Sequence, residues 1–231
     1  VVSVLAACAE RGIAVVPFGG GTSVVGGVAP EAGGFASVIA LDLVRTAALI
    51  DLDEVSLVAT LGAGTTGPQA EELLQARGFT LGHYPQSFEF ATIGGYAATR
   101  SSGQASRGYG RFDDLVHALR VATPAGELDL GRAPASAAGP DLRQLFLGSE
   151  GALGVLTEVT VRIKQLPAAT EYGAWTFPNF TAGAAAFREL TQRGIRPTVL
   201  RLSDKSETRV NATMGGHLTR LGGCLAIATF E

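Results

Sequence analysis

Cysteine, lysine and histidine are scarce in this sequence, and each scarcity argues against a class of protein. The 231 residues include two cysteines, Cys8 and Cys224, which lie far apart and form no C-x-x-C pair. Such a chain does not fit a disulfide framework, and it fits a reducing compartment. The three histidines, His83, His117 and His217, are scattered along the chain. A histidine-rich metal site is therefore not expected, and no metal is assigned.

Charge and long apolar runs are also limited. Charged residues make up 17% of the chain and the formal net charge is −3, so nothing indicates a general affinity for nucleic acid or anionic membrane. No apolar run is long enough for a membrane span. Hydrophobic residues make up 46%, which is typical of a well-buried globular protein. Lysine occurs only at Lys164 and Lys205, which together with abundant alanine and glycine indicates GC-rich coding. We therefore expect a bacterial, cytoplasmic protein.

Alternating and helical patterns predict a mixed α+β chain. The predicted helices cover residues 2–11, 68–77, 141–147 and about 182–193. The predicted strands cover residues 13–16, 37–43, 47–52, 55–61, 115–123, 127–130, 155–163, 172–177 and 198–202. Pro167 marks a boundary, so we expect one domain over 1–166 and the incomplete start of a second over 167–231. Val1 begins inside a helical pattern and Glu231 follows an apolar run, so both ends look cut.

The segment from His83 to Gly110 has neither a helix nor a strand period. A compact domain rarely keeps a long irregular segment without a use for it. Its glycines would let a ligand approach the backbone, its hydroxyls and arginines would supply donors, and its aromatic rings would supply a wall. Residues 92–95 could begin a short helix whose free N–H groups face an anion. The segment therefore predicts a wrap around a large, flat, phosphorylated cofactor; the alternative is a surface Ω-loop.

A glycine-rich turn follows the strand over 13–16. In Pro17–Ser23 three successive glycines would let backbone N–H groups point into one concavity that binds phosphate oxygens. No lysine follows the glycines, so this is not a nucleoside-triphosphate P-loop. The alternative is a flexible turn.

A second glycine motif, Gly62–Gly67, matches G-x-G-x-x-G between a strand and a helix. Glu89 even lies about 20 residues further on, as a dinucleotide fingerprint requires. No buried parallel strand follows the helix, and the strand before the motif is predicted to pair in a hairpin. We therefore interpret the motif as a tight strand-to-helix turn and not as a nicotinamide site.

Two further features carry alternatives that the residues leave open. Gly148–Leu156 places three glycines around Glu150 and leads into a strand, which would allow close approach to a ring or a ribose. Glu150 could equally be a capping residue. Arg201 sits between two leucines of a predicted strand. It could face an anionic substrate or pair with an acid on a solvated face.

Taken in order, four segments resemble the FAD-binding domain of the PCMH-type, or vanillyl-alcohol oxidase, flavoproteins. They are residues 17–23, 85–103, 109–128 and 145–163. The nearest likeness is to the alkylglycerone-phosphate synthase family, on residues 82–103 and 137–158. The first and last segments are shared with D-lactate and glycolate dehydrogenases. The resemblance implies a PCMH-type FAD-binding domain of two α/β subdomains, followed by the start of an α/β cap domain that holds substrate.

The resemblance also implies roles for individual residues. Residues 17–23 would hold the pyrophosphate, 85–91 and 98–101 would line the flavin and its phosphates, and 150–156 would meet the adenosine and isoalloxazine side. The implied cofactor-binding residues are Pro17, Phe18, Gly19, Gly20, Gly21, Thr22, Ser23, Pro85, Gln86, Ser87, Phe88, Glu89, Phe90, Ala91, Ala98, Thr99, Arg100, Ser101, Glu150, Gly151, Ala152, Leu153, Gly154, Val155 and Leu156. No histidine occurs in 17–27, where covalent relatives often carry the flavin link, so non-covalent FAD is expected.

The activity implied is the exchange of an acyl for an alkyl chain on dihydroxyacetone phosphate through a flavin N5 adduct. Arg201 matches an arginine that the synthases need, and is the candidate catalytic residue. The alternative is an FAD-linked dehydrogenase or oxidase of a D-2-hydroxy acid such as lactate or glycolate. A nucleotide-binding module without catalysis is the third reading. The expected partner is a small or lipid-like substrate. Proton-transfer residues and any homodimer contacts would lie beyond Glu231.

Overall fold

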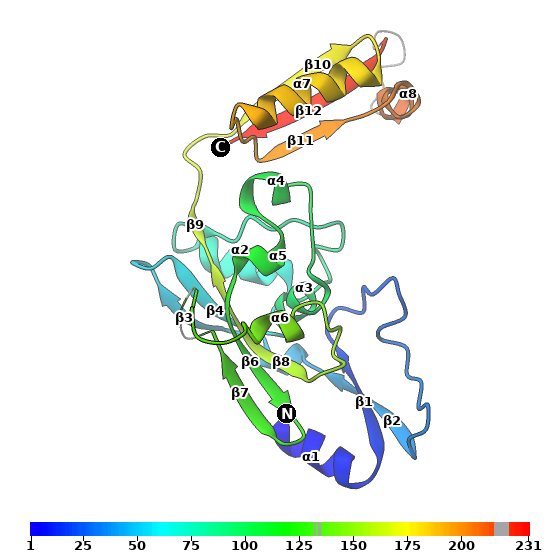
Figure 1. Ribbon diagram of the computed structural model, residues 1–231, viewed down its shortest axis with the longest axis vertical. Helices are drawn as coiled ribbons and strands as arrows, with labels where there is room; N and C mark the ends of the chain where they lie inside the picture. The colour runs from blue at the N-terminus through cyan, green and yellow to red at the C-terminus, as the bar shows by residue number, and fades with distance from the viewer. Residues whose placement is uncertain (132, 134, 215–221) are drawn as a thin grey trace. The chain divides into compact units, whose positions relative to one another are not determined.

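The computed structural model describes residues 1–131, 133, 135–214 and 222–231 (Figure 1). The chain divides into two compact units. The first comprises residues 1–103 and 111–166, and the second comprises residues 104–110 and 167–231. The second unit thus begins again at Pro167, and the short segment 104–110, which lies inside the irregular loop, also belongs to it.

An antiparallel sheet forms the centre of the first unit. Its strand order is β3-β4-β8-β6-β7. The strands are β3 Leu49–Asp53, β4 Val58–Gly62, β8 Val155–Arg162, β6 Val116–Thr123 and β7 Gly126–Leu130. Alternate β-branched residues such as Val159 and Val161 are fully buried, which is the pattern that predicts strands here. Each such side chain contributes about 1.5–3 kcal/mol when it leaves water.

Two helices complete the hydrophobic core of this sheet. They are α2 Gly67–Gln75 and α3 Ile93–Thr99, which bury Leu74 and Tyr96 against it. The apolar side of α2 is only partly buried. Ala70 and Leu74 are fully buried, whereas Leu73 is 36% exposed and Arg77 is exposed. The stripe of α2 that packs against the core is therefore narrow, and the side chains at its edge are exposed to solvent.

A smaller parallel pair precedes the sheet. Helix α1, Val2–Glu10, leads into β1 Ile13–Phe18, which pairs in parallel with β2 Ser37–Asp42. Cys8 is buried in α1, as its apolar neighbours predict. The connection over 19–36 carries the glycine-rich turn at the end of β1 (Figure 1). The remaining elements of the unit are η1 Val44–Thr46, β5 Phe79–Thr80, β9 Lys164–Gln165, α5 Phe112–Leu115 and α6 Arg143–Phe146.

The G-x-G-x-x-G motif serves packing. Strand β4, which leads into it, pairs antiparallel with both neighbours, so a dinucleotide fold is excluded. A Cβ on Gly62 would lie 1.7 Å from the carbonyl oxygen of Thr46, and one on Gly64 would lie 1.8 Å from that of Leu43. The glycines are therefore needed because η1 crosses the motif closely. The interpretation as a tight turn is confirmed.

The second unit is a three-stranded antiparallel sheet with helices. Its strand order is β10-β12-β11. Its elements are β10 Glu171–Phe177, β12 Cys224–Phe230, β11 Val199–Leu202, α7 Phe180–Gln192, α8 Lys205–Met214 and α4 Ser106–Tyr109. Helix α7 packs along the sheet through Gly183, where a Cβ would meet Leu202 at 2.7 Å (Figure 1). Helix α4 is tied in by a hydrogen bond from Gly108 N to Thr198 O at 3.2 Å.

The described residues form neither a membrane-spanning helix nor a metal-binding cluster. No helix there is both long and apolar enough to cross a membrane. No cluster of three or more histidine, cysteine or acidic side chains is arranged to hold a metal ion in that part of the chain.

Candidate functional site

A cavity of about 340 Å³ in the first unit gathers the three glycine-rich segments. They are far apart in sequence, at 17–28, 87–101 and 150–156. The predicted site residues that line it are Pro17, Gly19, Gly20, Gly21, Thr22, Ser23, Ser87, Ala91, Ala98, Thr99, Ser101, Glu150, Gly151, Gly154 and Leu156. The fold thus brings together most of the residues that the resemblance assigns to one cofactor.

The turn after β1 carries a row of unpaired donors. Among the described residues, no acceptor is recorded for the backbone N–H groups of residues 19–23, all of which line the cavity. Gly21 has φ +67°, a left-handed conformation that favours glycine. Successive free N–H groups on a turn of this kind form an anion-binding concavity. This turn therefore fits a pyrophosphate.

The same turn packs tightly on the second segment. A Cβ on Gly20 would lie 1.8 Å from the carbonyl oxygen of Phe90, and one on Gly19 would lie 2.4 Å from Thr92 Oγ1. These glycines are therefore required by protein packing. A flexible turn does not describe backbone that is packed this closely.

The predicted anion site at the start of α3 is wrong. The N-cap Thr92 accepts from Gly95 N at 3.2 Å, while Ile93 N donates to Thr65 O and Gly94 N donates to Ala63 O. The helix start is thus already satisfied by the protein. The helix contributes instead a smooth wall, because Gly94, Gly95 and Ala98 present little side chain to the cavity.

The third segment approaches through a strained turn. Glu150 has φ +52° and Gly151 has φ +87°. A left-handed glutamate is uncommon and is kept where the surroundings impose it. Here Glu150 N donates to Ala98 O at 3.0 Å, which places the turn beside α3 with its side chain on the cavity.

Some predicted contacts do not line this cavity, and others were missed. Those that lie outside its lining are Phe18, Pro85, Gln86, Phe88, Glu89, Phe90, Arg100, Ala152, Leu153 and Val155. Phe90, for example, is 65% exposed. The lining residues absent from the predicted set are Val24, Val25, Gly27, Val28, Leu43, Thr92, Gly94, Gly95 and Tyr96. The valines that follow Ser23 in the sequence could have indicated part of this lining. In the structure, Val24 and Val25 are exposed at the edge of the glycine turn.

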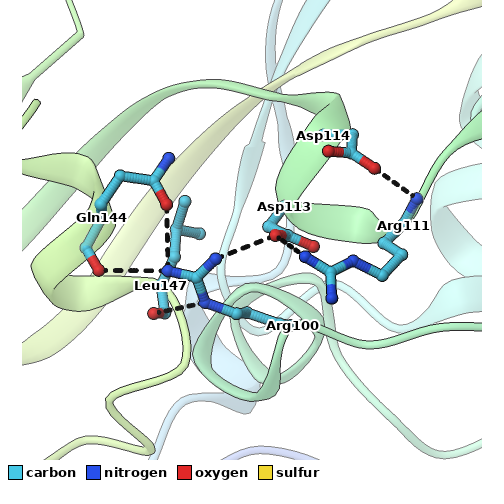
Figure 2. A network of polar contacts seen from close by, with 6 residues as sticks. All are labelled: Arg100, Arg111, Asp113, Asp114, Gln144 and Leu147. Atoms are coloured by element: carbon cyan, nitrogen blue, oxygen red, sulfur yellow. Dashed lines mark hydrogen bonds and ion pairs between the residues drawn. The ribbon is translucent and has the colours of Figure 1, made fainter.

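Arg100 is the clearest correction. It was predicted to supply donors to the cofactor phosphates, yet its guanidinium is bound by Leu147, Asp113 and Gln144, away from the cavity (Figure 2). The described lining of the cavity holds backbone groups and hydroxyls but no arginine, so these are the donors that it could offer to a phosphate.

A buried histidine stands directly behind the cavity. His83 is 2% exposed, and its Nε2 lies 3.0 Å from the hydroxyl of Ser101, which lines the cavity. The rings of Tyr96 and Phe112 meet it edge-on. Burial lowers the pKa of His83 to about 4, so it is neutral at pH 7. Burial, and then the charge of Glu71, raise the pKa of Tyr96.

Because His83 is buried and neutral, the free energy of unfolding of the protein should depend on pH. The unfolded residue takes a proton near pH 6.5, whereas the folded one takes it near pH 4. Between these values the unfolded state binds more protons, so the free energy of unfolding should fall as pH drops, by up to about 3 kcal/mol. Urea unfolding of the wild type and His83→Gln at pH 7.5 and 4.5 measures it. Equal losses in both proteins would contradict this account.

Arg201 lies in the second unit, on β11. Its side chain is exposed and forms an ion pair with Glu207 at the start of α8. The hydrogen bond that Arg201 donates in this pair, together with a second one from Ser203, holds the pKa of Glu207 below its ordinary value. Pairing with an acid on a solvated face is the alternative that the sequence leaves open for Arg201. The pairing leaves the guanidinium accessible.

Comparison with known proteins identifies the family. The profile of the FAD binding domain matches residues 1–130. The chain belongs to this family. The profile of the C-terminal domain of FAD linked oxidases matches residues 166–231. FAD is therefore the cofactor of the chain, and the unpaired donors of residues 19–23 fit its pyrophosphate.

The individual relatives include two kinds of flavoprotein. An alkyldihydroxyacetonephosphate synthase of Trypanosoma brucei brucei is 39% identical over 91% of this chain and 34% of its own length. A solved alkyldihydroxyacetonephosphate synthase structure superposes on 100% of the chain and 45% of its own length, with a TM-score of 0.88 and 31% identity. A mitochondrial cytochrome D-lactate dehydrogenase of Arabidopsis thaliana is 33% identical over 94% of the chain and 38% of its length. The predicted α+β, PCMH-type FAD-binding fold is thus confirmed. The chain spans about a third of the length of the curated relatives it matches.

Proposed function

We propose that the chain is the FAD-binding part of an alkyldihydroxyacetonephosphate synthase-like enzyme, which exchanges an acyl for an alkyl chain on dihydroxyacetone phosphate. The observation that carries the proposal is the whole-length superposition on a synthase structure at a TM-score of 0.88. Synthases from three organisms share 35–39% identity with the chain, against 33% for the plant D-lactate dehydrogenase.

The residues would divide the work of holding FAD. The backbone donors of residues 19–23 would bind the pyrophosphate, and Thr22 and Ser23 would add hydroxyl donors. The glycine and alanine face of α3 would let a flat ring lie close to the backbone. FAD, when bound, would supply an electron-accepting N5 atom. Ser101, whose hydroxyl His83 orients from behind, would present a fixed hydrogen-bonding group to the flavin side.

We assign FAD as non-covalently bound. No histidine or cysteine lines the cavity among the described residues. His83 is buried behind Ser101, and both cysteines are buried elsewhere. The imidazole or thiol side chain that a histidyl or cysteinyl flavin link needs is therefore missing from the described lining of this cavity.

The second unit is assigned to the substrate. Arg201 would bind the phosphate of the substrate as a planar, permanently charged donor. Its exposed position on β11 suits this role, and the pairing with Glu207 would be exchanged for the substrate anion. The start of a cap domain over 167–231, a lipid-like substrate and a bacterial, cytoplasmic setting belong to the same proposal.

A second function, oxidation of a D-2-hydroxy acid, is favoured by the D-lactate dehydrogenase relative. Hydride transfer would reduce the flavin, whereas acyl-to-alkyl exchange has no net redox change. Anaerobic mixing of the complete protein with D-lactate or glycolate is therefore expected to leave the flavin spectrum oxidised. The same protein should incorporate a labelled long-chain alcohol into an acyl dihydroxyacetone phosphate. Rapid bleaching near 450 nm by either hydroxy acid, without alcohol incorporation, would replace the synthase by the dehydrogenase.

A further inference from the structure

The side chain of Arg100 leaves the cavity that its neighbours line. Thr99 and Ser101 both line that cavity, whereas Arg100 does not. Arg100 is the C-cap of α3, with φ +50° and ψ +50°. An arginine adopts this left-handed conformation at an energetic cost, so its surroundings must compensate. The compensation comes from the partners of its guanidinium.

Four acceptor groups, from three residues in two other segments, hold that guanidinium (Figure 2). Nε donates to the carbonyl of Leu147 at 3.0 Å. Nη2 donates to the carbonyl and the side-chain oxygen of Gln144 at 3.2 and 2.9 Å. Nη1 donates to Asp113 Oδ2 at 3.0 Å. One side chain thus joins the end of α3 to α6 with its following turn and to α5.

The segment that Arg100 grips leads straight into the cavity wall. Gly148 has φ +80°, and a Cβ there would lie 2.9 Å from Arg100 Nε. Its N–H donates to Ala97 O at 3.2 Å, and two residues later Glu150 N donates to Ala98 O. Glu150 and Gly151 then line the cavity. The position of this wall relative to α3 therefore depends on the hydrogen bonds by which Arg100 holds the preceding turn.

Asp113 anchors the other end of the guanidinium. Its side chain is 6% exposed, and its Oδ2 accepts from Arg100 and also from Arg111 at 2.6 Å (Figure 2). Its Oδ1 is buried and has no hydrogen-bond partner among the described residues. Arg111 shares this carboxylate with Arg100, but it has no recorded hydrogen bond to the described residues of 143–154. Arg111 is therefore a matched control for charge near Asp113.

We propose that Arg100 is a positioning residue of the FAD site, which fixes the Glu150–Gly154 wall against α3 without contacting FAD. The inference rests on FAD binding in the cavity and not on the synthase reaction. It reverses the assignment that sequence pattern gives to this arginine. It also separates two roles that a cation near a phosphate site could have, direct charge pairing and support of the wall.

The test compares Arg100→Gln, Arg100→Lys and Arg111→Gln by titrating deflavinated protein with FAD. Both Arg100 variants are expected to bind FAD about 10- to 100-fold more weakly, the effect of displacing a site wall by a fraction of an ångström. Lysine keeps the charge but not the planar fork that serves four acceptor atoms. Arg111→Gln should bind like the wild type. A direct phosphate contact would instead spare Arg100→Lys and damage only Arg100→Gln.

Two further readouts distinguish positioning from general damage. The salt dependence of FAD affinity should be the same in Arg100→Gln and wild type, because no ion pair with phosphate is lost. The effect of Glu150→Gln on affinity should largely disappear in the Arg100→Gln background, since the wall is already displaced. If Arg100→Gln does not fold, Gln144→Ala removes one acceptor and should weaken FAD about fivefold.

Full affinity in Arg100→Gln, wild-type affinity in Arg100→Lys, or equal losses in Arg100→Gln and Arg111→Gln would overturn the proposal. Failure of the wild-type protein to bind FAD in this cavity would instead overturn the site itself. Failure of the alcohol-exchange assay alone would leave the role of Arg100 intact, because FAD affinity does not depend on the substrate.

Discussion

Replacing Gly95 by valine is expected to weaken FAD binding by about a hundredfold while the apoprotein stays folded. Gly95 lies on the cavity wall, and a Cβ there would meet only Thr92 Oγ1, at 3.3 Å. The first carbon thus needs only a small shift of the Thr92 hydroxyl, but the valine methyl groups would enter space that the cofactor needs. Overpacking of a site costs about 1–3 kcal/mol, and its upper end gives this loss. In a helix valine is no worse than glycine, so α3 should persist.

Fluorescence titration with FAD and thermal unfolding of the apoprotein measure the two halves of this expectation. Gly34→Val is the control, because Gly34 has open space around its Cβ and lies outside the cavity lining. Gly20→Val behaves differently. Its Cβ would collide with the carbonyl of Phe90, so it should lose stability as well as FAD. Wild-type FAD affinity in Gly95→Val would show that the cofactor lies elsewhere.

Replacing Arg201 by lysine is expected to reduce the exchange activity of the complete protein at least about a hundredfold with FAD affinity unchanged. A lysine preserves charge but cannot bind a phosphate through two parallel hydrogen bonds. If Arg201 serves the substrate, the loss should appear mainly as weaker binding of the acyl dihydroxyacetone phosphate and slower turnover. Steady-state kinetics and FAD titration on the same preparation separate these quantities.

Glu207 supplies the matched control for Arg201. The two side chains form one exposed ion pair, and pairs of this kind contribute little to stability. Under the substrate reading, Glu207→Gln should keep activity, because it frees the guanidinium. Under the structural reading, Arg201→Lys and Glu207→Gln should have equally small effects. Similar activities in the two variants would therefore remove Arg201 from the catalytic assignment.

The glycine-rich turn after β1 could be predicted because its signal is local. Three glycines at the end of a strand, without a following lysine, already imply free backbone donors at one turn. The same local reasoning rejected the Gly62–Gly67 motif, since the hairpin partner of β4 can be recognised from the adjacent acidic turn. The positions of most strands and helices could be predicted for the same reason, because they follow from the local spacing of apolar residues.

The direction of Arg100 could not be predicted because it depends on distant residues. Sequence neighbours place it beside Ser101 on the cofactor loop, but its partners Gln144 and Leu147 lie more than forty residues away. The left-handed turn that aims the side chain is not visible in composition. The same limit explains segment 104–110, whose attachment to the second unit rests on contacts such as Gly108 with Thr198.

The most direct test of the central claim is a crystal structure of the protein with FAD bound. The pyrophosphate oxygens are expected to lie within hydrogen-bonding distance of the backbone N–H groups of residues 19–23. We also expect the flavin against α3, no covalent bond to a side chain, and Arg100 still on Gln144 and Leu147. Pyrophosphate at Gly62–Gly67, or a guanidinium of Arg100 turned onto the phosphates, would contradict the central claim.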